Sequence, residues 1–145
     1  MNRVLLMSVV SWAAAQVIKV IVELICNREL NIRRIMSSGG MPSSHSATVC
    51  ACAVTTGMDC GFTSAAFGMA CVMAFIVMYD ATNVRRETGE QSKILNYMME
   101  NWEEKPDLFA QQLKELIGHT PLQVFVGAVL GVAIAVLGYF LIPMG

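Results

Sequence analysis

Residues 4–26 read VLLMSVVSWAAAQVIKVIVELIC, and residues 121–142 read PLQVFVGAVLGVAIAVLGYFLI. Each run is long enough for a helix across the hydrocarbon core of a bilayer, which takes roughly 20 apolar residues. The first run is too long for the core of a cleaved signal peptide, and it contains Lys19 and Glu23. We therefore expect both runs to be membrane spans.

Two shorter apolar stretches lie between these runs, over residues 42–58 and 62–78. The turn from Gly57 to Gly61 joins them, which predicts a helical hairpin. Of the 145 residues, 55% are hydrophobic and 14% are charged, with a mean hydropathy of +0.55. Soluble domains carry about 25% charged residues. The sequence thus predicts an all-α, multi-pass membrane bundle of about four transmembrane helices in a single domain over residues 1–145.

The segment from residue 80 to residue 120 is more polar, yet it carries two apolar patterns with helical spacing. The first comprises Ile94, Leu95, Met98, Met99 and Trp102, and the second comprises Leu108, Phe109, Leu113, Leu116 and Ile117. Such patterns are typical of amphipathic helices that lie on a membrane surface. The alternative is a helical hairpin that packs on itself. We expect two amphipathic surface helices here.

The basic residues are distributed unevenly over the expected loops. Arg28, Arg33 and Arg34 lie in the first loop and five more Lys or Arg lie in residues 80–120, so this side has eight and the other side has Arg3. By the positive-inside rule the basic side faces the cytoplasm and both termini face outward. We expect the plasma membrane of a bacterium. The net charge of −1 gives no basic field for a nucleic-acid partner.

The cysteine pattern predicts neither a disulfide nor a zinc site. The five cysteines form no Cys-x-x-Cys pair and show no Cys/His metal spacing. Most lie inside the expected spans, where cysteine behaves as a small apolar residue.

The first span carries four polar or aromatic residues at i, i+4, i+7 and i+11: Trp12, Gln16, Lys19 and Glu23. We expect this face to point into the bundle, because intramembrane ionisable groups are costly and are functional candidates by default. One alternative is that Lys19 and Glu23 neutralise each other while Lys19 snorkels to the interface. Another is an intramembrane relay in a small transporter.

Residues 37–46 read SSGGMPSSHS and precede the second stretch. Pro42 suits the first turn of a helix, so the helix begins with Ser43, Ser44 and His45. Unpaired N–H groups, hydroxyls and the positive end of the helix dipole form a natural anion site. The alternative is a capped helix start with a solvated His45.

Two further clusters lie on the same side of the membrane. Asp80, Arg85 and Arg86 follow the third stretch, where arginines hold either lipid headgroups or a bound phosphate. His119 precedes the last span, and Gln123 follows it by one helical turn. The chain has two histidines, and this topology places both on the basic side.

Four motifs together resemble the divergent PAP2 family, which is related to acid phosphatases and vanadium-dependent haloperoxidases. They are Gly39-Gly40-Met41-Pro42-Ser43-Ser44-His45-Ser46-Ala47, the run from Tyr79-Asp80-Ala81 to Arg86, Gln91 with Leu95-Asn96, and Gly118-His119-Thr120-Pro121. The resemblance covers nearly the whole chain. It implies a metal-independent phosphatase without a cofactor, whose substrate is an isoprenyl or glycerolipid phosphate.

The resemblance also implies roles for individual residues. His119 would attack phosphorus to form a phosphohistidine, and His45 would protonate the leaving oxygen. The phosphate would be held by Lys19, Ser43, Ser44, Arg85 and Arg86.

The sequence departs from the wider superfamily in three places. No Arg-Pro follows Lys19 at the usual spacing, and 33 positions separate Arg86 from His119, where the superfamily has a handful. Gln123 stands in place of the aspartate that orients the nucleophilic histidine, unless Asp80 supplies that carboxylate. The alternative function is therefore a non-catalytic membrane protein that binds lipid phosphate or scaffolds a partner. A chain this short with four spans is also compatible with a homo-oligomer.

Overall fold

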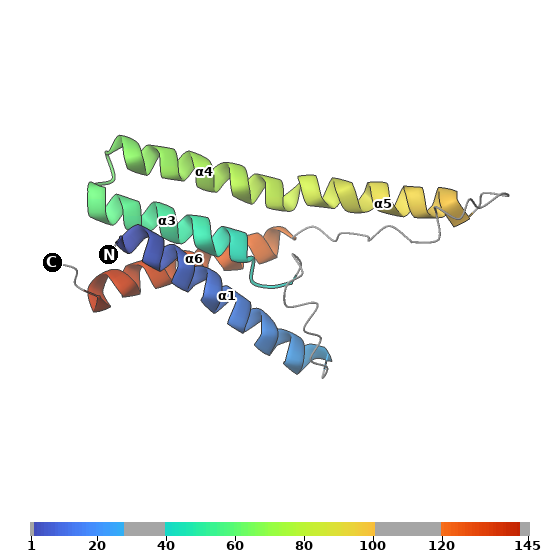
Figure 1. Cartoon of the computed structure of the whole chain (residues 1–145), viewed down its shortest axis with the longest axis horizontal. Coiled ribbons are helices and arrows are strands. Elements are labelled where there is room, and N and C mark those ends of the chain that lie inside the picture. The colour runs from blue at the N-terminus through green and yellow to red at the C-terminus, as the bar shows by residue number, and fades with distance from the viewer. Residues whose placement is uncertain (1, 28–39, 101–119, 143–145) are drawn as a thin grey trace.

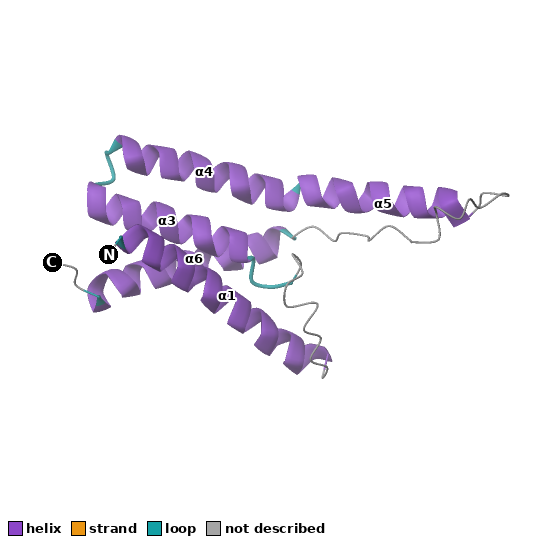
Figure 2. Cartoon of the chain, viewed as in Figure 1, coloured by secondary structure: helices purple, strands orange, loops and turns teal. Residues whose placement is uncertain are grey.

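The computed structural model describes residues 2–27, 40–100 and 120–142, and within these ranges it contains five α-helices and no strand (Figures 1 and 2). The helices are α1 (Arg3–Asn27), α3 (Ser44–Cys60), α4 (Ala65–Thr82), α5 (Val84–Glu100) and α6 (Pro121–Leu141). The all-α class expected from the sequence is confirmed. So are the helices over the two long apolar runs, and the hairpin that α3 and α4 form.

A short polar side chain begins each of the four apolar helices. Asn2 Oδ1 accepts a hydrogen bond from the Leu5 amide at 3.1 Å at the start of α1. The N-cap residues of α3, α4 and α6 are Ser43, Ser64 and Thr120, and each side chain accepts from an amide three residues later. These bonds satisfy amides that have no partner inside the helix, and so they fix where each helix begins.

Helix α3 occupies the centre of the bundle. It packs against α6, α1 and α4, whereas α1 and α4 do not pack extensively on each other (Figure 1). Its buried residues are small or hydroxylated: Ser44, Ser46, Ala47, Ala51, Ala53, Thr55, Thr56 and Gly57. Because neighbouring helices cover α3, it needs few of the large apolar side chains that contact lipid.

Three helices are long and apolar enough to cross a membrane, namely α1, α4 and α6. The sequence predicted about four spans, and the difference is α3, whose 17 residues extend only about 25 Å. The exposed large apolar side chains of the three candidates point outward from the bundle, as a lipid environment requires.

The interior is built from stripes of residues four positions apart. On α1 the stripe is Met7, Ser11, Ala15 and Lys19, each at most 4% exposed, and on α6 it is Gly127, Gly131 and Ala135. The corresponding residues of α3 are Ala47 and Ala51, both fully buried. Small residues at this spacing let transmembrane helices approach until their backbones touch.

The buried stripe on α1 corrects one expectation. Lys19 does point into the bundle, but Trp12, expected on the same inward face, is 50% exposed. Rows of residues four positions apart wind slowly around a helix. The buried row therefore passes through Ser11 and Ala15, and the indole of Trp12 lies outside it.

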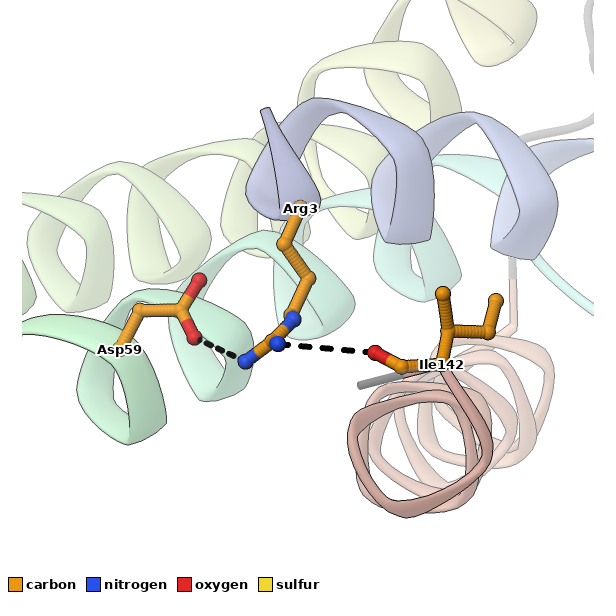
Figure 3. Close-up of polar contacts among 3 residues, drawn as sticks. All are labelled: Arg3, Asp59 and Ile142. Atoms are coloured by element: carbon orange, nitrogen blue, oxygen red, sulfur yellow. Dashed lines mark hydrogen bonds and ion pairs between the residues drawn. The ribbon is translucent and has the colours of Figure 1, made fainter. Parts of the chain in front are cut away.

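One end of the bundle is held by Arg3, and we refer to it as the Arg3 end. Arg3 Nη1 donates to Asp59 Oδ1 at 2.7 Å, and Arg3 Nη2 donates to the Ile142 carbonyl at 3.5 Å (Figure 3). The guanidinium also lies 4.6 Å from the centroid of the Tyr139 ring. The start of α1 is thereby tied to the ends of α3 and α6.

Helix α5 follows α4 after the single residue Asn83 and continues close to the direction of α4 (Figure 1). It contains four residues of the first expected amphipathic pattern, of which Ile94, Leu95 and Met98 are exposed, while the fifth, Trp102, lies outside the described residues. That α5 contacts a membrane surface stays a prediction. The second expected amphipathic helix, over Leu108 to Ile117, lies outside the described residues.

Candidate anion site

The N-termini of α3 and α6 lie side by side at the end of the bundle opposite Arg3, which we call the Ser43 end. The Ser43 amide donates to the Gln123 carbonyl at 3.0 Å. Glycine at position 127 is required here, because a Cβ would overlap the Ser43 carbonyl oxygen. Since the two helices run parallel, the positive ends of their dipoles meet at this joint.

Lys19 reaches the same end from α1, with 4% of its surface exposed. Its methylene stem lies against Gly40, where an added Cβ would be 3.3 Å from both Lys19 Cγ and Lys19 Cδ. Gly40 has a φ of +95°, a conformation that favours glycine. The loop before α3 therefore covers the Lys19 stem and leaves a cationic group buried beside the helix start.

The two adjacent serines differ in what their polar groups contact. Ser43 is fully buried, and its Oγ accepts from the Ser46 amide at 3.4 Å and from the Ser46 hydroxyl at 3.1 Å. Its amide and carbonyl are also engaged, with Gln123 and Ala47 respectively. Ser43 thus has little left to offer a ligand beyond its hydroxyl hydrogen.

Ser44 is 6% exposed, and neither its hydroxyl nor its amide has a hydrogen-bond partner among the described residues. An amide in the first turn of a helix has no acceptor within the helix itself. Ser44 therefore presents two donors at the Ser43 end, and these are groups that an oxyanion accepts from.

His45 and Asp80 are both exposed, His45 in the first turn of α3 and Asp80 in the last turn of α4. The Asp80 side chain forms no hydrogen bond or ion pair within the described part of the chain. Its assignment as a substitute carboxylate stays a prediction.

Gln123 has a structural role that sequence reasoning missed. Its Oε1 accepts from the Thr120 amide at 3.1 Å, while Thr120 Oγ1 accepts from the Gln123 amide at 3.4 Å. This is a capping box, with Pro121 in the first turn of the helix. The sequence signal was available, because Thr-x-x-Gln before an apolar run is the pattern of such a cap.

The remaining candidates are not placed. His119 lies outside the described residues, and Arg85 and Arg86 are in the first turn of α5 with side chains that are not described. Of the phosphate ligands expected from the sequence, the structure thus brings Lys19, Ser43 and Ser44 to one end of the bundle. It adds Gly40 and Gly127, which the sequence did not single out as site residues, although Gly127-x-x-x-Gly131 is a known signal of close helix packing.

Comparison with known proteins identifies the family of the chain. The model of the divergent PAP2 family matches residues 1–134. An uncharacterized membrane protein of Bacillus subtilis (strain 168), YuiD, is 38% identical over 151 aligned positions, which cover 96% of each chain. No solved structure matches the chain. The protein is therefore a membrane protein that belongs to the divergent PAP2 family.

Proposed function

We propose that the protein is a metal-independent phosphatase that hydrolyses a membrane lipid phosphate. The observation that carries this proposal is the burial of Lys19 beside the start of α3, where it is 4% exposed and covered by Gly40. A buried positive charge attracts an anion more strongly than an exposed one, because solvent and salt screen it less. Two helix N-termini that meet at the same end add a field that favours an anion.

The phosphate would be held by charge and by donors that the bundle already orients. Lys19 supplies a positive charge, and Ser44 supplies its hydroxyl and its amide. Arg85 and Arg86, at the start of α5, would approach from the side of α4. Positioned charges and donors of this kind are the main protein contribution to phosphoryl transfer.

The chemistry would use the two histidines in turn. The His119 imidazole attacks phosphorus, so that a P–N bond forms while the bond between phosphorus and the leaving oxygen breaks. His45 gives a proton to that oxygen, and the lipid alcohol leaves. Water then attacks the phosphohistidine while its proton passes to His45, which breaks the P–N bond, releases inorganic phosphate and restores both histidines.

The membrane setting restricts the substrate to an amphiphile, such as an isoprenyl or glycerolipid phosphate. We infer that α3 is the fourth span, enclosed by α1, α4 and α6, and that residues 1–145 form one domain. The charge distribution along the chain supports a cytoplasmic location for the Ser43 end.

One observation favours a second candidate, a protein that binds lipid phosphate without hydrolysing it. The Gln123 side chain occupies a capping box where the superfamily has an aspartate. An amide stabilises a developing imidazolium poorly, and the same exchange in the serine-protease triad costs about 10⁴-fold in rate.

A direct assay separates the two candidates. Purified protein is incubated with isoprenyl and glycerolipid phosphates, with and without EDTA and with and without vanadate. Phosphate release that EDTA leaves unchanged and vanadate blocks supports the phosphatase. Saturable binding of the same lipids with no release above that of His119→Ala supports the binding protein.

A further inference from the structure

We infer that Gly127 is the positioning residue of the anion site, because it sets the joint at which the N-termini of α3 and α6 meet. The inference rests on the proposed function, and it concerns how the site is assembled rather than which group reacts. Gly127 is buried in the second turn of α6 and has no side chain that could take part in the reaction.

The joint consists of two contacts with the same residue. The Ser43 amide donates to the Gln123 carbonyl, and the Ser43 carbonyl oxygen occupies the space that a Cβ on Gly127 would fill. Together the contacts hold the first two turns of α6 against the start of α3. The first of these turns carries the Thr120 cap, directly after His119 in the chain.

An alanine at position 127 therefore has to push α6 away from Ser43, since the opposing atom is backbone and has no rotamer to escape into. The displacement would stretch the Ser43–Gln123 hydrogen bond and separate the two helix ends. A misplacement of about 1 Å at a reacting centre costs on the order of 10²-fold in rate.

The chain offers a matched control one turn deeper. A Cβ on Gly131 would overlap the Ala47 carbonyl oxygen in the same way that a Cβ on Gly127 overlaps that of Ser43. Gly131→Ala thus creates the same kind of clash between the same two helices, but farther from the site. The two variants are expected to lose similar thermal stability. They are expected to differ in amide exchange and in anion binding at the Ser43 end.

The first test measures amide hydrogen exchange of the full-length protein in detergent. Gly127→Ala is expected to raise exchange of the Ser43 amide by about tenfold or more, and Gly131→Ala is expected to raise it less. Equal exchange at Ser43 in both variants would overturn the inference. If Gly127→Ala does not fold, the wild type decides: a Ser43 amide that exchanges as fast as the amides of the exposed turn at residues 61–63 also overturns it.

The second test uses orthovanadate as the probe and measures its dissociation constant. We expect Gly127→Ala to weaken vanadate binding at least tenfold, and Gly131→Ala to weaken it by less than threefold at a matched margin below its own melting temperature. Weakening by the same factor in both variants argues against a positioning role. If the wild type binds no vanadate, the proposed function and the anion site are both wrong. The exchange comparison then still decides whether Gly127 sets the joint between α3 and α6.

Discussion

Arg3 and Asp59 form an ion pair at 2.7 Å that connects the first turn of α1 to the last turn of α3 (Figure 3). The side chains are 12% and 26% exposed, so the pair is largely shielded from solvent. Arg3 is also the one basic residue that the positive-inside rule assigns to the outer side. The ion pair holds its guanidinium between helices, so that the start of α1 is fixed against the end of α3.

Removing the carboxylate should destabilise the bundle, because Arg3 would keep a shielded charge without its partner. We expect Asp59→Ala to lower the unfolding free energy by roughly 1.5–3 kcal/mol, the range for hydrogen bonds to charged groups. Asp59→Asn keeps an acceptor and should cost less. Thermal unfolding in detergent measures both. Since Asp59 is at the end opposite the anion site, vanadate affinity should not change. A large loss of affinity would contradict the separation of the Arg3 end from the anion site.

The orientation can be tested with one native cysteine and one introduced cysteine. Cys60 is exposed at the end of α3, and Gln91 is exposed on α5. An impermeant maleimide added to intact cells should label Cys60 and spare Gln91→Cys, whereas permeabilised cells should label both. Cys60→Ser supplies the background. Labelling of Gln91→Cys alone in intact cells would reverse the orientation and place the site outside.

Lys19 should separate a phosphate ligand from a structural ion pair. Lys19→Met preserves the stem that packs on Gly40 and removes the charge. If Lys19 binds phosphate, this variant should lose vanadate binding by at least tenfold, in line with the 1.5–3 kcal/mol of a hydrogen bond to a charged group, and keep its melting temperature. If Lys19 only compensates Glu23, the variant should unfold earlier, and adding Glu23→Gln should restore stability. That rescue, with vanadate affinity unchanged throughout, would remove Lys19 from the site.

The two serines at the start of α3 are expected to behave in opposite ways. Ser43→Ala removes the cap and should cost about 1 kcal/mol of stability, with vanadate affinity changed only slightly in the folded protein. Ser44→Ala removes a hydroxyl that has no partner among the described residues. It should leave the melting temperature nearly unchanged while weakening vanadate binding several-fold. Titrations and melting curves of both variants test this, and the reverse result would return the ligand role to Ser43.

The positions of the helices could be predicted from local sequence patterns, whereas the residues that form the core could not. The apolar runs and the residues Ser43 and Thr120 locate the helix starts, because caps and periodicity act within a few positions of the chain. The burial of Ser11 and the exposure of Trp12 depend on the path of α1 across its neighbours, which no local pattern encodes. For the same reason α3 was expected to resemble the other spans, although its central position selects small residues.

At the candidate site, residue types were predictable but their partners were not. Lys19 and Ser44 stand out as polar residues in apolar surroundings. The engagement of Ser43 with Gln123 joins positions 80 residues apart, and it depends on the glycine that lets α6 approach. The capping role of Gln123 could be predicted from the local sequence. The resemblance to a catalytic motif instead assigned this position a role beside the nucleophilic histidine.

The last prediction concerns the two histidines and Gln123. A nucleophile is needed to form the phosphoenzyme whatever the leaving group, so His119→Ala should abolish hydrolysis of every phosphate ester. A general acid matters most for a poor leaving group, where proton transfer contributes about 10²–10⁴-fold. His45→Ala should therefore spare an aryl phosphate with an activated leaving group and lose activity on an alkyl phosphate.

At position 123 the capping box makes glutamate a more informative substitution than aspartate. Glutamate keeps the length that the capping box with Thr120 requires, whereas aspartate is one methylene shorter and would disturb the cap. If the missing carboxylate limits turnover, Gln123→Glu should thus raise the rate without loss of stability. Gln123→Met offers neither the acceptor of the capping box nor a carboxylate, so it should lower stability without raising the rate. Initial rates of all variants on both esters, with melting temperatures, provide the measurement. Indistinguishable rates for the wild type, Gln123→Glu and His119→Ala would favour the protein that binds lipid phosphate without hydrolysing it.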